Sequence, residues 1–306
     1  MKKDLISIKD LTKADLEGIF NLADSLKKRP DRFSHTLKGK MLALIFQKPS
    51  CRTRVSFEVG MYQLGGSSLY LGPDQIKLGL RETIADIART LSRYVDAITL
   101  RTFAHENILE MAKYANIPVI NALTDLLHPC QALADIYTVR EKFTNLKKVR
   151  LAYIGDGNNV CHSLLYGCSK IGLNLNIATP RMYAPQRRII EQAKSFAKIT
   201  GARIQLFNEA TQAVRGADVI YTDVWASMGQ EKETRIRKDH FKKFQVNKKL
   251  ASLAKGGCLI MHCLPAHRNQ EITDEIIDCP DSIVFDQAEN RLHVQKAILI
   301  LLLGAD

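Results

Sequence analysis

An arginine-rich turn with hydroxyl groups lies at residues 50–54, between an apolar, strand-like run at 41–46 and a helical pattern at 55–64. The unpaired amides of a helix start, together with the guanidinium groups of Arg52 and Arg54, suit an anion. The GxxxxGK[ST] motif of nucleotide-binding loops does not occur in the sequence. The turn therefore predicts a site for the phosphate of a small metabolite, although a capped helix start at the surface would use the same residue types.

A second polar cluster opens a helical pattern at residues 129–143. His128 and Gln131, with Pro129 in the favourable first turn, could hold a carbonyl and an amide group by complementary donors and acceptors. A purely structural helix cap fits them equally well. Arg101 ends the earlier strand-like run at 97–100, where packing alone does not explain a guanidinium group. We regard it as the third candidate of the N-terminal half.

The turn at residues 155–159 resembles a dinucleotide-binding turn only in part. Its third glycine is absent, and residues 174–179 offer no carboxylate for a ribose hydroxyl. We therefore do not expect NAD as a cofactor. Asn158 and Asn159 fit an ordinary turn, but they also follow a strand, where α/β proteins bind ligands.

Two more clusters follow strand-like runs in the C-terminal half. Asp223 begins a segment with the only tryptophan and could recognise an ammonium group, although an acidic turn is an alternative. The segment 258–267 holds two cysteines and two histidines, which invites a zinc interpretation. Because adjacent side chains of a strand point to opposite faces, His262 and Cys263 should diverge, and the remaining spacing is not that of a zinc finger. We expect no metal ion and a cysteine thiol facing an interdomain cleft.

The elements that would position these residues alternate along the chain. Strand-like runs occur near 41–46, 67–71, 95–101, 117–120, 149–154, 174–178, 203–207, 217–222, 258–263 and 282–285, and helical patterns lie between many of them. The alternation predicts an α/β fold with two domains, 1–146 and 147–306, each a mostly parallel sheet flanked by helices. The last helix, about 290–306, is too apolar to stand alone, and we expect it to pack back toward the N-terminal domain.

Composition narrows the class of protein. The 306 residues are 46% hydrophobic, enough to bury the cores of two domains. The 7 cysteines form no CxxC pair, which favours a reducing compartment over a disulfide framework. No signal peptide or membrane-length apolar run is evident, so we expect a cytoplasmic protein without a membrane partner. The net charge of +12 is spread along the chain, which suggests steering of anionic substrates rather than nucleic-acid binding.

The ordered set of motifs resembles the aspartate/ornithine carbamoyltransferase family. The set comprises residues 50–54, Arg101, 128–131, 156–159, 223–229 and 262–265, closed by 289–291. The segment 223–229 is similar to that of family members that act on ornithine. The resemblance implies transfer of a carbamoyl group from carbamoyl phosphate to the δ-amine of L-ornithine, giving citrulline and phosphate, with no cofactor. It also implies that the two domains close around the two substrates.

The same resemblance assigns expected roles to individual residues. The carbamoyl phosphate site would comprise Ser50, Cys51, Arg52, Thr53, Lys77, Arg101, His128, Pro129, Cys130, Gln131, Cys263, Leu264 and Arg291. The ornithine site would comprise Asn159, Asp223, Ser227 and Met228. Arg101, His128, Asp223 and Cys263 would be catalytic. Donors from Thr53, Arg101 and His128 would then stabilise the oxyanion that forms on the attacked carbonyl.

Two positions depart from the family pattern. Cys51 stands where the family usually has threonine, so we expect weaker or compensated phosphate binding. Lys77 stands at the position from which the family sends a residue of the neighbouring subunit into the phosphate site, and a lysine could act there as a point charge. The resemblance therefore implies shared active sites in a homotrimer or a multiple of trimers.

Other functions remain open at this stage. Within the family, aspartate, putrescine or another amine could replace ornithine; Asp223 favours a substrate with an α-amino group. A nucleic-acid-binding protein would leave the polar clusters after the strands without a purpose. A dinucleotide oxidoreductase would need the fingerprint that the turn at 155–159 lacks.

Overall fold

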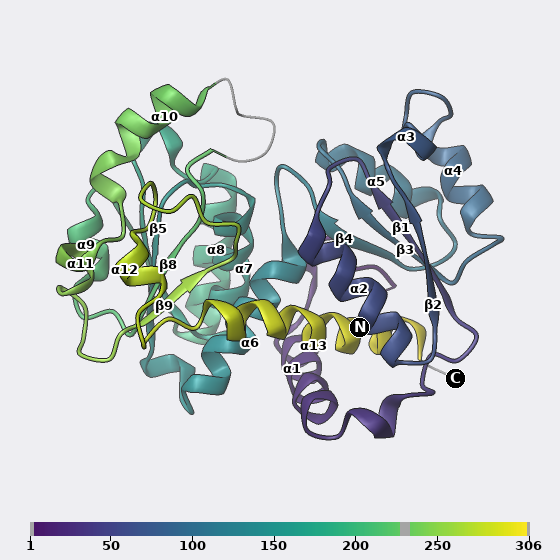
Figure 1. Ribbon diagram of the computed structural model, residues 1–306, viewed down its shortest axis with the longest axis horizontal. Helices are drawn as coiled ribbons and strands as arrows, with labels where there is room; N and C mark the ends of the chain where they lie inside the picture. The colour runs from purple at the N-terminus through teal and green to yellow at the C-terminus, as the bar shows by residue number, and fades with distance from the viewer. Residues whose placement is uncertain (1–2, 227–232, 305–306) are drawn as a thin grey trace. The chain divides into compact units, whose positions relative to one another are not determined.

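The computed structural model describes residues 3–226 and 233–304, and Figure 1 shows its helices and strands. The chain folds as two compact units. Unit 1 comprises the residues up to 134 and those from 289 onward, and unit 2 comprises residues 135–288. The domain boundary between 146 and 147 stays a prediction. In the described residues no helix is both long and apolar enough to cross a membrane.

The described part of unit 1 contains a sheet of parallel strands in the order β2-β1-β3-β4. The strands are β1 (Met41–Phe46), β2 (Ser67–Leu71), β3 (Ala97–Arg101) and β4 (Val119–Leu123). β1 and β3 lie in the middle and are buried almost throughout, which explains their continuous apolar sequence. The polar residues that follow these two strands are therefore attached to firmly packed backbone.

Helices precede, connect and follow these strands. They are α1 (Lys13–Lys28), α2 (Cys51–Gln63), α3 (Pro73–Ile76), α4 (Ile84–Leu91), α5 (His105–Tyr114) and α6 (Pro129–Lys142), the last of which runs on into unit 2. Short 3-10 turns occupy Ile8–Asp10 and Pro30–Phe33. α1 begins with a capping box in which Thr12 and Asp15 satisfy each other's backbone amides. This local chemistry is visible in the sequence.

Unit 2 contains, in its described residues, a parallel sheet in the order β7-β6-β5-β8-β9. The strands are β5 (Arg150–Ile154), β6 (Asn174–Ala178), β7 (Ile204–Phe207), β8 (Val219–Thr222) and β9 (Leu259–His262). The helices are α7 (Asn159–Ile171), α8 (Arg187–Thr200), α9 (Ala210–Val214), α10 (Thr234–Phe241), α11 (Lys248–Ala251) and α12 (Asp274–Ile277). Short 3-10 turns lie at Leu146–Lys148, Arg181–Tyr183 and Lys242–Phe244. The predicted α/β class is confirmed for both units.

The C-terminal helix α13 (Val284–Leu303) returns to unit 1, as predicted. Figure 1 shows it beside α1, where Lys27 Nζ donates to Asn290 Oδ1 at 3.0 Å. Further along α13, Lys296 Nζ donates to Gln63 Oε1 at 2.8 Å. Gly60 permits this approach, because an added Cβ would lie 3.3 Å from the Lys296 side chain.

The predicted strand at 282–285 is wrong. Only Ser282 makes a bridge, to Ile260 of β9, and α13 already begins at Val284. The apolar run here is too short to separate a strand from a helix start. The helical spacing of Val284, Gln287 and Asn290, all buried, shows which pattern the chain follows.

Candidate active site

The predicted anion turn is the start of α2 in unit 1. Ser50 is the N-cap, and its Oγ accepts a hydrogen bond from the Thr53 amide at 3.3 Å. Arg291 of α13 donates from Nη2 to Thr53 Oγ1 at 3.1 Å and from Nη1 to Gln131 Oε1. The structure thus brings Ser50, Thr53, Gln131 and Arg291 together, although they come from three separate parts of the chain.

Positive charge is concentrated beside this turn. Arg101, at the end of β3, is 8% exposed, and its Nε has no hydrogen-bond partner among the residues that the structure describes. Burial, followed by the charges of Arg291 and Arg52, lowers the pKa of Arg101 to about 10. In residues 3–226 and 233–304, no carboxylate forms an ion pair with Arg52 or Arg101. Guanidinium groups held close together without a carboxylate favour an anionic ligand.

His128 is buried in the same charged environment. Burial, then the charges of Arg291, Arg101 and Arg52, holds its pKa well below the ordinary value. The imidazole is therefore neutral at physiological pH and can donate a hydrogen bond without adding charge. Burial also raises the pKa of the neighbouring Cys130 to about 12, and its Sγ donates to the Asn121 carbonyl at 3.4 Å.

The side chains of Arg54 and Lys77 have no contact with this group among those described. Arg54 pairs with Glu58 at 2.9 Å, and its guanidinium lies 3.8 Å from the centre of the Tyr70 ring. Lys77 is exposed and ends α3 with a left-handed backbone (φ 41°). Its role in a neighbouring subunit stays a prediction.

Lys48 is a residue that the sequence analysis missed. It is 3% exposed, pairs with Asp125, and places Nζ 4.2 Å from the centre of the Phe103 ring. The pair joins the loop after β1, which leads to Ser50, to the loop after β4. A single lysine beside an apolar run gives no signal in the sequence, because most such lysines are solvated.

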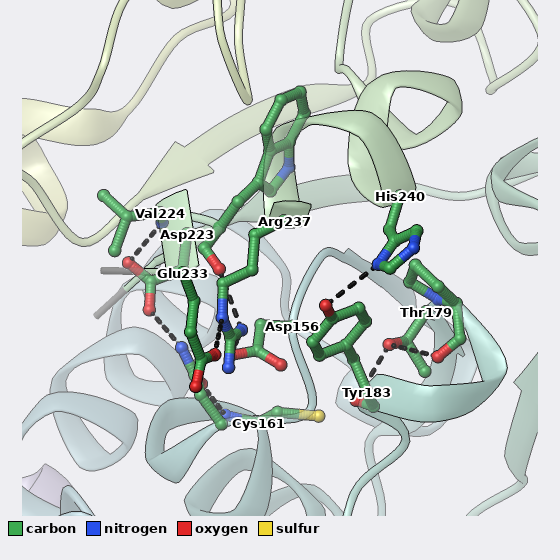
Figure 2. Close-up of polar contacts among 12 residues, drawn as sticks. Asp156, Cys161, Thr179, Tyr183, Asp223, Val224, Glu233, Arg237 and His240 are labelled. Carbon is green, nitrogen blue, oxygen red and sulfur yellow. Dashed lines mark hydrogen bonds and ion pairs between the residues drawn. The ribbon is translucent and has the colours of Figure 1, made fainter. Parts of the chain in front are cut away.

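In unit 2, Asp223 gathers donors from three segments. Asn158 Nδ2 donates to its Oδ2 at 2.7 Å, and the Val224 amide donates to its Oδ1 at 2.8 Å. Cys263 Sγ also donates to Oδ1, at 3.0 Å. Burial, then the charge of Asp223, raises the pKa of Cys263 well above its ordinary value, so the thiol is a neutral donor. Figure 2 shows the hydrogen bond between the carboxylate of Asp223 and Val224.

Asn158 and Asn159 occupy different positions at the start of α7. Asn158 is the N-cap, and its Oδ1 accepts from the amides of Val160 at 3.0 Å and Cys161 at 3.1 Å. Its amide nitrogen is thereby aimed at Asp223. The predicted ligand Asn159 is the first residue of the helix, half-buried. The predicted ligands Ser227 and Met228 lie outside the described residues.

A buried pair fixes the segment after β9. His262 and Glu271 are both 0% exposed, and His262 Nε2 lies 3.1 Å from Glu271 Oε1. His262 Nδ1 accepts from the Leu264 amide at 2.9 Å, where the backbone takes the left-handed φ of 56°. His262 and Cys263 therefore contact different partners, as strand geometry predicts. No group of three potential ligands for a metal ion occurs among the residues that the structure describes.

The glycine-rich turn after β5 serves chain packing. A Cβ on Gly157 would lie 2.3 Å from the Pro185 nitrogen and 2.5 Å from the Tyr183 carbonyl oxygen. The Gly157 amide donates to that same carbonyl at 2.9 Å. The close approach of the neighbouring backbone therefore requires glycine at this position. Chain packing alone accounts for this glycine of the partial dinucleotide motif.

Comparisons with known proteins agree with this arrangement. The model of the "Aspartate/ornithine carbamoyltransferase, carbamoyl-P binding domain" matches residues 3–141, and that of the "Asp/Orn binding domain" matches residues 147–302. The chain belongs to the aspartate/ornithine carbamoyltransferase family.

Members of this family are similar over nearly the whole chain. The ornithine carbamoyltransferase of Thermococcus kodakarensis is 51% identical over 304 residues, covering 99% of this chain and 96% of the relative. That of Bacillus subtilis is 53% identical over 297 residues, covering 97% and 92%. The solved structure of ornithine carbamoyltransferase from Pyrococcus furiosus has a TM-score of 0.96 at 50% identity, covering 99% and 97%.

A second network missed in the sequence lies in the Asp/Orn-binding segment of this family member. Arg237 of α10 is 6% exposed, and its Nη1 lies 3.0 Å from Asp156 Oδ2 and 3.0 Å from the Trp225 carbonyl oxygen. Its Nε donates to Glu233 Oε2 at 3.0 Å, and the guanidinium lies 4.7 Å from the centre of the Tyr183 ring. Figure 2 shows Arg237 reaching from α10 to the turn after β5. An arginine in a charged helix gives no sign in the sequence that it is buried.

The Asp156–Arg237 pair predicts a specific pH effect. Burial, only partly offset by Arg237, raises the pKa of Asp156 from 3.8 to about 6. Between these values the native state keeps a proton that the unfolded chain has lost, so stability decreases as pH rises. We expect the free energy of unfolding of wild type, relative to Asp156→Asn, to fall by about 1–3 kcal/mol from pH 4 to pH 6. Denaturant titrations at several pH values measure this, and parallel curves for the two proteins would contradict it.

Proposed function

We propose that this protein is an ornithine carbamoyltransferase that transfers the carbamoyl group of carbamoyl phosphate to the δ-amine of L-ornithine. The observation that carries the proposal is the group of guanidiniums at Arg52, Arg101 and Arg291, in which Arg291 donates to Thr53 and, among the described residues, neither Arg52 nor Arg101 pairs with a carboxylate. This group lies in a member of the aspartate/ornithine carbamoyltransferase family, and relatives at about half identity carry the name ornithine carbamoyltransferase. The products are citrulline and phosphate.

Unit 1 supplies the groups that the carbonyl and the leaving group need. Attack on the carbonyl carbon develops an oxyanion, which Thr53, Arg101 and neutral His128 stabilise by hydrogen bonds. The departing phosphate gains charge, which Arg52 and the start of α2 stabilise. Ser50 holds the turn in shape through the Thr53 amide.

Unit 2 supplies the groups that an amino acid needs. Asp223 recognises the α-ammonium group, with Asn159, Ser227 and Met228 completing the ornithine site. The δ-amine has a reference pKa near 10 and must lose a proton before it attacks. Cys263 is a neutral donor to Asp223 rather than a thiolate, so it orients the carboxylate and does not act as a nucleophile.

Citrulline formation from carbamoyl phosphate and a panel of amines tests the proposal. We expect L-ornithine to be the best substrate, because it has the α-amino group that Asp223 would recognise and that putrescine lacks. The panel also includes aspartate, which would need cationic side chains for its second carboxylate. No turnover of ornithine, or faster turnover of putrescine, would refute the assignment.

Lys48 should matter for carbamoyl phosphate more than for ornithine. Lys48→Met keeps the buried stem but removes the ammonium that joins two loops of unit 1, while Asp125, with its side chain 59% exposed, stays solvated. We expect kcat/KM for carbamoyl phosphate to fall about 10-fold, since small displacements of binding groups are costly. The KM for ornithine should change little.

A lysine at the other end of the same strand provides the control for Lys48. Lys40 pairs with Asp96 at 3.4 Å, with both side chains about one-third exposed. Lys40→Met should leave the kinetics of both substrates near wild type, because exposed ion pairs contribute little. Equal effects of Lys40→Met and Lys48→Met would argue against a specific role for Lys48.

We further propose a homotrimer, or a multiple of trimers, in the cytoplasm with active sites shared between subunits. Large apolar side chains are exposed on unit 1, among them Tyr62, Leu80 and Tyr94, each at least 74% exposed. Aromatic and large apolar side chains are common in subunit interfaces, so these residues support an interface on unit 1. The exposed Lys77 lies three residues before Leu80 and would reach the phosphate site of a neighbour.

Mixing two inactive variants tests the sharing of sites. A subunit with Lys77→Ala keeps Arg101, and a subunit with Arg101→Ala keeps Lys77. If the two groups act across an interface, a mixed trimer contains some intact sites, so activity should return after mixing under conditions of subunit exchange. Mixed trimers that stay as inactive as the parents would rule out the role of Lys77.

A further inference from the structure

Cys51 is the cysteine of this chain most accessible to solvent. It is the first residue of α2 and is exposed, whereas Cys263 and Cys279 are half-buried and the remaining cysteines are buried. Burial raises the pKa of the thiols of Cys130, Cys161, Cys168 and Cys258, and that of Cys263 is also raised. Thiols with raised pKa values react slowly, because the thiolate is the nucleophile.

The surroundings of Cys51 point independently to an anionic ligand. Arg52 follows it directly, and Arg291 donates to Thr53 two residues further on. Arg101 is more than nine-tenths buried, its Nε lacks a partner in the described part of the chain, and the charges of Arg291 and Arg52 act on it. A negatively charged reagent would therefore be drawn to the helix start where the thiol lies.

We propose that Cys51 is a modification site whose thiol exchanges with small anionic disulfides, and that the attached group closes the anion site. The thiol gives its proton to solvent, and the sulfur forms a new S–S bond to the reagent. The S–S bond of the reagent breaks, and half of it leaves as a thiolate. A free thiol reverses the exchange and restores Cys51. No net oxidant beyond the disulfide itself is needed.

The catalytic consequence rests on the proposed function, whereas the modification itself does not. A mixed disulfide at the first residue of α2 would place a bulky, negatively charged group beside Arg52 and Thr53. Carbamoyl phosphate and inorganic phosphate would then compete with that group for the same donors. A threonine at this position could not form a mixed disulfide. This inhibition would therefore occur only in proteins with a cysteine at this position.

The experiment treats the intact native protein with 5,5′-dithiobis(2-nitrobenzoate), an anionic disulfide whose released thiolate is coloured. We expect one thiol per chain to react fast, releasing one equivalent of the coloured thiolate. Peptide mass mapping should locate the modified thiol at Cys51. Because the guanidinium groups beside Cys51 attract the anionic reagent, added sodium chloride should slow its reaction with Cys51 more than its reaction with a small uncharged thiol in solution. Inorganic phosphate should slow the reaction at Cys51.

Cys51→Thr should lose the fast equivalent, whereas the matched control Cys279→Ser should keep it. Modified wild type should lose citrulline formation and recover it with dithiothreitol, while treated Cys51→Thr should keep whatever activity it had before treatment. Fast modification of Cys279 or Cys263, or a rate at Cys51 that phosphate does not lower, would contradict the proposal that Cys51 is the modification site. Modification of Cys51 without loss of activity would overturn its effect on catalysis. If the untreated protein forms no citrulline, the proposed function fails, but the labelling still decides the site.

Discussion

Replacing Arg101 by methionine should lower kcat/KM for carbamoyl phosphate about 100- to 1,000-fold, the effect of removing one donor to an oxyanion. The same change should raise the free energy of unfolding of the unliganded protein. Burial and the neighbouring charges of Arg52 and Arg291 lower the pKa of Arg101 to about 10, so its charge is unfavourable in the native state at neutral pH. We expect a gain of about 1–3 kcal/mol.

These opposite effects separate a functional role from a structural one. Substitution of a structural arginine would destabilise the protein, whereas substitution of Arg101 should lower its activity and raise its stability. Inorganic phosphate should also raise the Tm of wild type more than that of Arg101→Met, because binding to the native state stabilises it. Arg54→Met is the control, since Arg54 pairs with Glu58 and stacks on Tyr70, and it should change kcat/KM far less. A fall in both activity and stability for Arg101→Met would contradict the proposed role.

Sequence reasoning found the strand ends of unit 1 because local patterns carry the information. The apolar run of β1 and the Ser50 cap are both readable from neighbouring residues. The strand predicted at 282–285 failed because a short apolar run does not distinguish a strand from the first turn of α13. Where an element begins therefore depended on packing that no local pattern contains.

Burial of charged side chains could not be predicted in the same way. Lys48 and Arg237 look like solvated residues in the sequence, yet both are almost fully buried with carboxylate partners distant in the chain. The neutral state of His128 depends on three arginines that only the fold brings near it. Motifs thus identified which residues take part, whereas their protonation and mutual orientation came from tertiary structure.

Asp223→Asn should lower kcat/KM for L-ornithine by about 1,000-fold or more, since charge-assisted recognition of an ammonium group in a buried site is lost. Asp223 is 6% exposed and accepts from Asn158, Val224 and Cys263. An asparagine has nearly the same shape, but its NH₂ group would face one of these donors. Asp239→Asn on the exposed face of α10 is the control and should leave ornithine kinetics unchanged.

A substrate without the α-amino group decides which role Asp223 has. 5-Aminopentanoate keeps the carboxylate and the reacting amine of ornithine but has no α-ammonium group. If Asp223 recognises that group, wild type should carbamoylate 5-aminopentanoate slowly, and Asp223→Asn should do so at nearly the same rate. If Asp223 instead assists loss of the proton from the δ-amine, the variant should be equally impaired with both substrates. The two substrates differ only at the α-carbon. An equal fall in kcat/KM for both would therefore show that Asp223 activates the nucleophile and does not recognise the α-ammonium group.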